Sequence, residues 1–237
     1  MSGVSPFKAV LFDLGDTLIR LAGSGDQLLL RAASALGVAE LRPAEASAVW
    51  QRVLDQASTP EELAKGRDLS TERHREVWTR LYADAGCDRL APGLSEELYT
   101  LTVSADSWEA FPATLPTLRA LRDRNIPVGV ISDTGFDFRP TMDRLGISPF
   151  VDVVVMSFQH GVCKPAPKLF LTACEQLGVE PRDTLMVGDN PLTDGGGNAA
   201  GLHVVLLPPS ALTDPRGIAA VLSLVGTPFE GHPGQSF

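Results

Sequence analysis

Five short apolar runs constrain the fold of this chain more than any other feature of its sequence. They are rich in valine, isoleucine and leucine, and they are apolar at successive positions. The runs are FKAVLF (7–12), IPVGVIS (126–132), VDVVVMS (151–157), DTLMVGD (183–189) and LHVVLLP (202–208). Strands that are apolar on both faces are typical of parallel sheets that helices cover on both sides.

Helical patterns lie between these runs. They cover residues 113–124, 138–146, 166–178 and 190–201. In the last of them we expect Asn190 to cap the N-terminus of a helix, with Pro191 at the first helical position. The alternation of strands and helices predicts an α/β fold, a doubly wound, Rossmann-like parallel sheet.

Residues 22–108 follow a different pattern. They consist of amphipathic helical stretches and contain none of the apolar runs. This predicts an all-helical domain inserted after the first strand, with an α/β core domain formed by residues 1–21 and 109–237. Trp50 and Trp78 are expected to fill the small core of the helical domain, because large aromatic side chains are usually well buried.

Charge and composition argue against several classes of protein. The net charge is −9 and no run of lysine and arginine is present, which argues against nucleic acid as a partner. The sequence shows neither a membrane-spanning stretch nor a signal-peptide pattern, so no membrane association and a cytoplasmic location are expected.

Cys87, Cys163 and Cys174 are expected to be reduced and mostly buried, without a zinc site. The oligomeric state is left open, and the tail over 226–237 is expected to fray.

Polar residues stand where the predicted strands end. Asp13, Ser132 and Asp189 close three of the runs, Lys164 follows a fourth, and Asp194 comes soon after Asp189. Since ligands of parallel sheets bind beyond the carboxyl ends of the strands, we expect these side chains to converge. Crowded carboxylates need a cation between them, and oxygen ligands favour Mg²⁺. A lysine and a hydroxyl group donate to phosphate oxygens.

Four motifs carry a family resemblance. They are FDLGDTL (12–18), VISDTG (130–135), CKPAPKLF (163–170) and MVGDNPLTDGGGNAAGL (186–202). In this order they resemble the motifs of the haloacid dehalogenase superfamily of hydrolases, in the phosphatase branch with a helical cap of the C1 class. The resemblance spans about residues 7–225. It implies a Mg²⁺-dependent hydrolase of a small phosphorylated metabolite.

The resemblance also implies a role for each motif residue. Asp13 is then the nucleophile, which forms an aspartyl phosphate. Lys164 offsets the charge of Asp13, and the phosphoryl group is bound by Ser132, Asp133 and Lys164. The implied ligands of Mg²⁺ are oxygen atoms of Asp13, Gly15 (its backbone carbonyl), Asp189 and Asp194.

Gly15 departs from the pattern of the family. The phosphatases carry a second aspartate at this position, which protonates the leaving alcohol and then activates water. Here the extra carboxylate is Asp16, one position later, and successive side chains of an extended segment point to opposite sides. The loss of a general acid and base slows a reaction by roughly 10²- to 10⁴-fold. Three explanations stay open: Asp16 swings into the site, a cap residue or a substrate group supplies the proton, or the protein is a slow hydrolase used mainly for binding.

Two alternative functions also stay open. One is a C–halogen hydrolase of the same superfamily, which needs no acid to protonate halide but also needs no Mg²⁺. The other is a non-catalytic ligand-binding protein on a decayed hydrolase fold. Substrate choice is assigned to the cap, where Arg67, Arg73, His74 and Arg75 lie on or beside a polar helix face. Such charges are either solvated or in contact with the non-phosphate end of the substrate.

Overall fold

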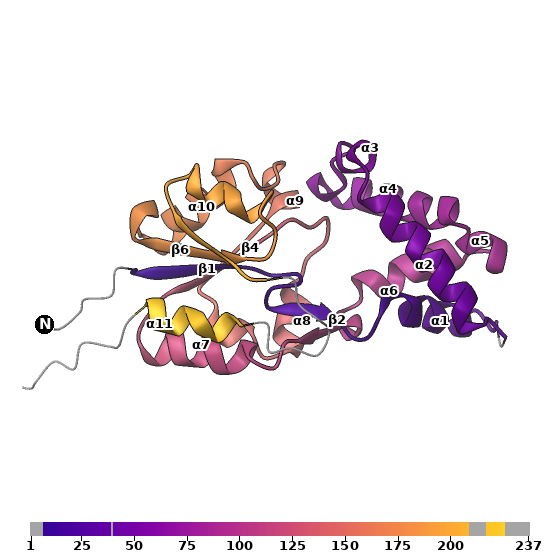
Figure 1. Ribbon diagram of the computed structural model, residues 1–237, viewed down its shortest axis with the longest axis horizontal. Helices are drawn as coiled ribbons and strands as arrows, with labels where there is room; N and C mark the ends of the chain where they lie inside the picture. Colours follow the sequence, from indigo (N-terminus) through magenta and orange to yellow (C-terminus); the bar gives the residue numbers. More distant parts are fainter. Residues whose placement is uncertain (1–6, 39, 209–216, 226–237) are drawn as a thin grey trace, which may run out of the picture.

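The computed structural model describes residues 7–38, 40–208 and 217–225, so the fraying expected over 226–237 lies outside the described residues. Figure 1 shows two parts side by side. One is a sheet with helices on both faces. The other is a group of helices formed by residues 22–107, which we call the helical insert.

The sheet has five parallel strands in the order β5-β4-β1-β6-β7. They are β1 (Ala9–Asp13), β4 (Val128–Ser132), β5 (Val153–Met156), β6 (Thr184–Gly188) and β7 (His203–Leu206). The predicted parallel α/β sheet is confirmed, and β1 is its central strand. The strands at the two edges of the sheet are less buried than the central ones. As an edge strand, β7 leaves His203 and Leu206 exposed.

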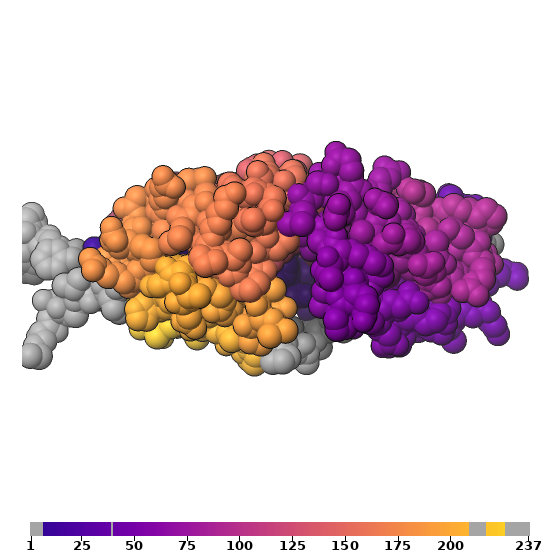
Figure 2. Space-filling model, turned by 90° about the horizontal axis from the view of Figure 1, so that it is seen from above, coloured from indigo at the N-terminus to yellow at the C-terminus, as the bar shows by residue number. Residues whose placement is uncertain are grey.

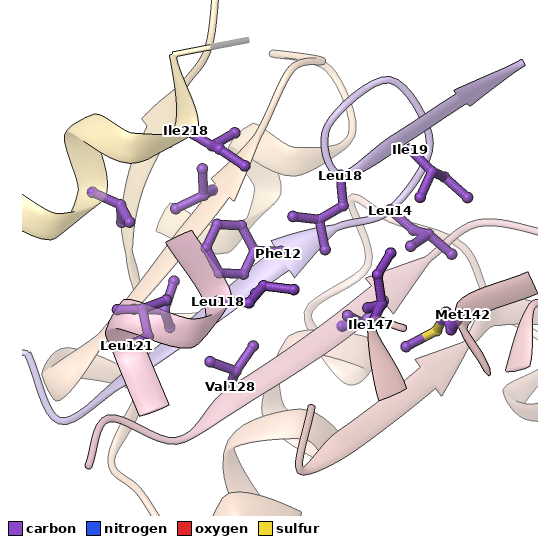
Figure 3. Packing of buried hydrophobic residues seen from close by; sticks show 14 of the residues in the cluster. Phe12, Leu14, Leu18, Ile19, Leu118, Leu121, Val128, Met142, Ile147 and Ile218 are labelled. Carbon is purple, nitrogen blue, oxygen red and sulfur yellow. The ribbon is translucent and has the colours of Figure 1, made fainter. Parts of the chain in front are cut away.

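Two hydrophobic layers cover the two faces of the sheet. Helices α7 (Thr114–Asp123) and α11 (Val221–Leu224) lie on one face, and α10 (Pro167–Leu177) lies on the other (Figure 1). Side chains alternate along β1, so Phe12 packs into the first layer (Figure 3) and Leu11 into the second. Full burial of one such side chain contributes about 1.5–3 kcal/mol. The central strand, and therefore the position of Asp13 at its end, is firmly fixed.

The helical insert has a hydrophobic core of its own. Its elements are α1 (Gly25–Ala35), α2 (Pro43–Ala57), α3 (Pro60–Leu63), η1 (Arg67–Leu69), α4 (Thr71–Ala85), α5 (Cys87–Leu90), α6 (Leu94–Val103) and η2 (Ala105–Ser107). Leu29, Val53 and Leu81 come from three different helices and are buried together. Trp50 and Trp78 pack against this core, as predicted.

Two short strands link the parts. β2 (Ile19–Leu21) and β3 (Trp108–Ala110) form an antiparallel pair where the chain enters and leaves the helical insert. Across the pair, Arg20 Nε donates to Glu109 Oε1 at 2.8 Å. The pair was not predicted, because strands this short show no period in the sequence. Both connections between the parts therefore run as one two-stranded ribbon.

The segment 190–201 is not the α-helix predicted from its sequence. It forms a turn followed by the 3₁₀ helix η5 (Asp194–Asn198). Asn190 Oδ1 accepts a hydrogen bond from the backbone N–H of Leu192 within the turn, instead of capping a longer helix. The three glycines that follow weaken an α-helix, since each costs roughly 1 kcal/mol relative to alanine.

Two of those glycines allow close packing under the loop. A Cβ atom at Gly196 would lie 2.5 Å from Pro165 Cβ, and one at Gly197 would lie 3.0 Å from Val204 Cγ2. Gly195 has open space around it. Two of the three glycines therefore pack closely against neighbouring residues, which a larger side chain would prevent.

Short elements complete the described part of the chain. They are α8 (Arg139–Arg144), η3 (Ser148–Phe150), α9 (Ser157–His160), η4 (Pro181–Asp183) and η6 (Ile218–Ala220). Cys87 and Cys174 are buried, Cys163 is half-buried, and all three are free thiols, as expected. Among the described helices, none has the length and apolar character needed to cross a membrane.

Candidate active site

The strand ends meet at one edge of the sheet, as predicted. Asp13 ends β1, Ser132 ends β4 and Asp189 follows β6. A cavity of about 420 Å³ lies over this edge, and these three residues line it together with Lys164 and Asp194. The helical insert forms the opposite wall of the cavity. Figure 2 shows the two parts in contact, with a hollow between them on one face.

Lys164 stands at the centre of the polar cluster. Its Nζ donates to Asp13 Oδ1 at 2.5 Å and to Asp194 Oδ1 at 2.6 Å. The side chains of Lys164, Asp13 and Asp194 are only 3%, 10% and 1% exposed. Asp194 Oδ2 accepts hydrogen bonds from the backbone N–H groups of Asp189 and Asn190, each at 3.0 Å. The third and fourth motifs are thus tied to the first through one buried ammonium group.

Burial and charge act in opposite directions on this cluster. Burial raises the pKa of Asp13 to about 6; the attraction of Lys164 opposes this shift and the charge of Asp194 adds to it. Burial alone would lower the pKa of Lys164, but the charges of Asp13 and Asp194 outweigh burial and raise it. Near neutral pH the site therefore holds a charged lysine beside an ionised Asp13.

Three carboxylates of the cluster fit a metal ion. One oxygen each from Asp13, Asp189 and Asp194 lies within 4.8 Å of the others. Gly15, whose backbone carbonyl is the fourth predicted ligand, lines the same cavity. Hard oxygen ligands of this kind favour Mg²⁺, and one lysine charge offsets only part of the charge of three carboxylates. The donor set is therefore suited to Mg²⁺.

The loop after β4 supplies the remaining predicted residues. Ser132 is 3% exposed and lines the cavity. Asp133 Oδ1 accepts a hydrogen bond from the backbone N–H of Lys164 at 2.9 Å. Burial raises the pKa of Asp133 to about 6, and Lys164 acts against this shift. The backbone N–H of Thr134 donates to Ser157 Oγ at 2.8 Å. Hydrogen bonds on both sides thus hold the loop in place.

Gly15 and Asp16 turn the chain directly after Asp13. Asp16 has a φ of 54°, in the left-handed region, and its backbone N–H donates to the carbonyl of Ile19 at 2.7 Å. Both Gly15 and Asp16 line the cavity, but Asp16 is exposed whereas Asp13 is buried. The two carboxylates of this loop therefore have different environments, and an acid–base role for Asp16 stays a prediction.

The four cap residues named from the sequence separate into two pairs. Arg67 and His74 line the cavity. Arg73 instead donates to the carbonyl of Lys65 at 3.0 Å, and Arg75 pairs with Glu96 at 2.7 Å. Helical periodicity indicates which face of a helix is apolar, but it does not say which end of that helix faces another domain.

Asp68 is a cavity residue that the sequence reasoning missed. It follows Arg67 in η1, and its side chain is 23% exposed. Burial raises the pKa of this carboxyl group, with Arg67 acting against the shift. Nothing in its sequence context distinguishes it from a surface aspartate, because the contacts that bury it come from other elements.

His74 is buried, which corrects its predicted place on a polar helix face. It is 4% exposed, its Nδ1 lies 3.0 Å from Tyr99 Oη, and its ring centroid lies 5.4 Å from that of Phe136. A Cβ atom added at Gly135 would lie 2.1 Å from His74 Cβ, so glycine is needed for this approach. Burial, together with the charge of Arg67, lowers the pKa of His74 to about 4.

The lowered pKa of His74 predicts a loss of stability in acid. The unfolded chain takes up a proton near pH 6.5, and the folded protein does so only near pH 4. The neutral ring therefore contributes stability that is fully present above pH 6.5 and is lost as the pH falls towards 4. Between pH 7 and pH 5 this contribution falls by roughly 2 kcal/mol. We expect urea unfolding of His74→Gln to show a correspondingly smaller loss over this interval than wild type.

The raised pKa values of Asp13 and Asp133 increase the stability of the folded protein as the pH falls, in wild type and in His74→Gln alike. The difference between the two proteins therefore reports the contribution of His74. His203→Gln, at an exposed position on β7, is the matched control for the exchange of a histidine for a glutamine. An equal loss of stability in wild type and His74→Gln would contradict the assignment.

A parallel sheet with an aspartate–lysine cluster at its carboxyl edge, faced by a helical insert, is the arrangement that the four motifs predicted for an α/β enzyme. A family model described as haloacid dehalogenase-like hydrolase matches residues 7–201. The chain belongs to this family, as its four motifs predicted, and the protein is a hydrolase.

Similar proteins agree with this assignment. The chain is 30% identical to a glyceraldehyde 3-phosphate phosphatase of Methanopyrus kandleri, over 84% of this chain and 82% of that protein. It is 28% identical to a phosphoglycolate phosphatase of Nitrosospira multiformis, over 86% and 84% of the two chains. The fold matches an L-2-haloacid dehalogenase structure from Xanthobacter autotrophicus with a TM-score of 0.61 and 20% identity, over 85% and 77% of the chains.

Proposed function

We propose that the protein is a Mg²⁺-dependent phosphatase, which hydrolyses a small phosphorylated metabolite through an aspartyl phosphate on Asp13. In this proposal residues 22–108 form a cap domain over a core domain of residues 1–21 and 109–237, and the location is the cytoplasm. The observation that carries the proposal is the buried Asp13–Lys164–Asp194 cluster, with Asp189 beside it. The phosphatase names of two similar proteins support the phosphate ester as the substrate.

The residues of the cluster would divide the work as follows. Asp13 attacks phosphorus through a carboxylate oxygen, which requires the ionised form. Lys164 favours that form, because its charge opposes the effect of burial on the pKa of Asp13. Ser132 and Lys164 are donors for the oxygens of the phosphoryl group. Ser132 ends β4 and Lys164 is buried between two carboxylates, so both donors would be in position before substrate binds, which is the arrangement that stabilises developing charge most strongly.

The metal would be held by the carboxylates of Asp13, Asp189 and Asp194 and by the carbonyl of Gly15. When bound, Mg²⁺ supplies positive charge that neutralises the oxygens of the transferring group. Without it, the lysine would face three carboxylates and the phosphate dianion alone.

The test is hydrolysis of p-nitrophenyl phosphate with Mg²⁺ and with a chelator. We expect phosphate release that requires Mg²⁺, and then a panel of sugar phosphates and phosphorylated acids identifies the substrate class. Halide release from a 2-haloacid in chelator, without phosphatase activity, would assign the C–halogen alternative. The absence of turnover with either class, together with ligand binding, would assign the non-catalytic alternative.

The glycine at position 15 predicts a gain of function. A Cβ atom there meets nothing within 4 Å and the backbone is not left-handed, so Gly15→Asp can be accommodated. The added carboxylate is expected to raise kcat/KM for sugar phosphates by roughly 10-fold or more, because an alkoxide needs protonation as it leaves. For p-nitrophenyl phosphate the gain should be smaller. Gly15→Asn, which adds no acid, is the control, and an equal gain on both substrates would contradict the prediction.

A further inference from the structure

We propose that Asp68 of the helical insert is the general acid and base of the reaction. The loop after β1 cannot supply this group from position 15, because that residue is a glycine. The inference rests on the proposed function. It concerns a catalytic residue that comes from the wall opposite the nucleophile.

The position of Asp68 is set by a contact with the core. Its backbone carbonyl accepts a hydrogen bond from Ser157 Oγ at 2.7 Å. The same hydroxyl group accepts from the backbone N–H of Thr134 at 2.8 Å. Thr134 lies directly after Ser132 and Asp133, whose side chains line the cavity. Asp68 is therefore held against the loop that follows β4, and its charge affects the pKa of Asp133.

The geometry of the displacement indicates that the proton donor comes from the helical insert. In an in-line displacement, the attacking and the leaving oxygens lie on opposite sides of phosphorus. Asp13 attacks from the sheet edge, so the leaving oxygen faces the helical insert. The insert side chains with acid–base groups that line the cavity are Asp68, His74 and Arg67 among the described residues. Arginine cannot be deprotonated in proteins, and the ring of His74 is neutral near pH 7.

The surroundings of Asp68 suit an acid that must hold a proton. Its Oδ2 lies 3.8 Å from Arg67 Nε and its Oδ1 lies 3.7 Å from His74 Nε2, both beyond hydrogen-bond distance. The charge of Asp68 also raises the pKa values of Asp133 and Cys163. Burial outweighs the charge of Arg67 and raises the pKa of Asp68. A catalytic acid is most effective when its pKa lies near the operating pH.

Two other carboxylates near the cavity are less suited. Asp16 is exposed and lies on the same loop as the nucleophile. Asp133 follows β4 on the sheet side of the cavity, and its Oδ1 accepts the backbone N–H of Lys164. Asp16 is therefore open to solvent, and the carboxylate of Asp133 is engaged with the backbone of the third motif. Only Asp68 among these three carboxylates stands on the wall that the leaving oxygen faces.

The two chemical steps balance with Asp68 in this role. An Asp13 carboxylate oxygen bonds to phosphorus, the bond from phosphorus to the ester oxygen breaks, and the ester oxygen takes the proton of the Asp68 carboxyl group. The alcohol then leaves. A water molecule next attacks phosphorus and gives a proton to the Asp68 carboxylate. The bond from phosphorus to Asp13 breaks, which releases inorganic phosphate and restores both residues.

The test uses the full chain with Mg²⁺ and compares p-nitrophenyl phosphate with phenyl phosphate and a sugar phosphate. For Asp68→Asn we expect kcat/KM to fall by about 10²-fold or more on the sugar phosphate and by much less on p-nitrophenyl phosphate. The p-nitrophenyl ester should give a burst of product followed by slow turnover, because the second step has lost its base. Gly15→Asp should restore activity to Asp68→Asn by a larger factor than it raises wild type.

Matched variants separate this role from a structural one. Asp84→Asn, at an exposed position of the same insert, should behave as wild type. If Asp68→Asn lowers kcat/KM equally for all three esters, Asp68 is structural and the inference is overturned. If the dependence on the leaving group appears in Asp16→Asn or Asp133→Asn instead, the inference is also overturned. An inactive wild type would overturn both this inference and the proposed function, whereas an active wild type with an unaffected Asp68→Asn would overturn the inference alone.

Discussion

Asp13→Asn is expected to reduce Mg²⁺-dependent turnover of p-nitrophenyl phosphate to background. The loss should be on the order of 10⁴-fold or more, as when one member of a catalytic unit is removed. The physical reason is that a neutral amide cannot form the bond to phosphorus that a carboxylate oxygen forms. Steady-state kinetics measure the loss. Mass spectrometry of the quenched enzyme should find a phosphoryl group on a peptide containing Asp13 in wild type and not in the variant.

The substitution is nearly isosteric, so the fold should be retained. Burial of an ionised Asp13 is unfavourable, which is why its pKa is raised, and an amide relieves that penalty. Asp123→Asn, at an exposed position of α7, is the control and should keep the activity of wild type. Unchanged turnover in Asp13→Asn would mean that the assigned active site is wrong.

Lys164→Met should show the largest change in stability. The ammonium group is buried between Asp13 and Asp194, and its removal leaves two buried carboxylates without their cation. Breaking a buried ion pair from one side costs about 3–5 kcal/mol. We therefore expect the free energy of unfolding, measured in urea at pH 7 with chelator, to fall by that amount. Activity should be lost as well.

Mg²⁺ provides a second readout for the same variant. If Asp13, Asp189 and Asp194 bind the ion, its charge replaces part of the missing ammonium charge, and Mg²⁺ should stabilise Lys164→Met more than it stabilises wild type. Lys168→Met removes an exposed lysine of α10, whose Nζ donates to a backbone carbonyl, and should change stability little. A loss in Lys164→Met no greater than in Lys168→Met would contradict the buried pair.

The sheet and its strand-end residues were predictable because local signals specify them. The apolar runs mark the strands, and parallel packing brings their ends together whatever the chain length between them. Asp13 and Lys164 are 151 positions apart and still meet for this reason. The cavity wall on the helical insert was not predictable, because burial of Asp68 and His74 depends on how the insert packs against Ser157 and Gly135. No period in the sequence encodes that contact.

The β2–β3 ribbon also has a consequence for the timing of the reaction. Both segments that connect the helical insert to the rest of the chain lie in this ribbon, so the insert is attached covalently along one margin of the cavity (Figure 1). At a second margin, near α9, the insert is held by contacts such as the Ser157–Asp68 hydrogen bond. The buried ring of His74 also packs against Gly135 and Phe136, so this second margin is held by noncovalent contacts alone. An opening of the molecule about the ribbon would carry Asp68 away from Asp13. The open molecule would then admit a phosphate ester but lack its proton donor, so turnover would be confined to the closed molecule.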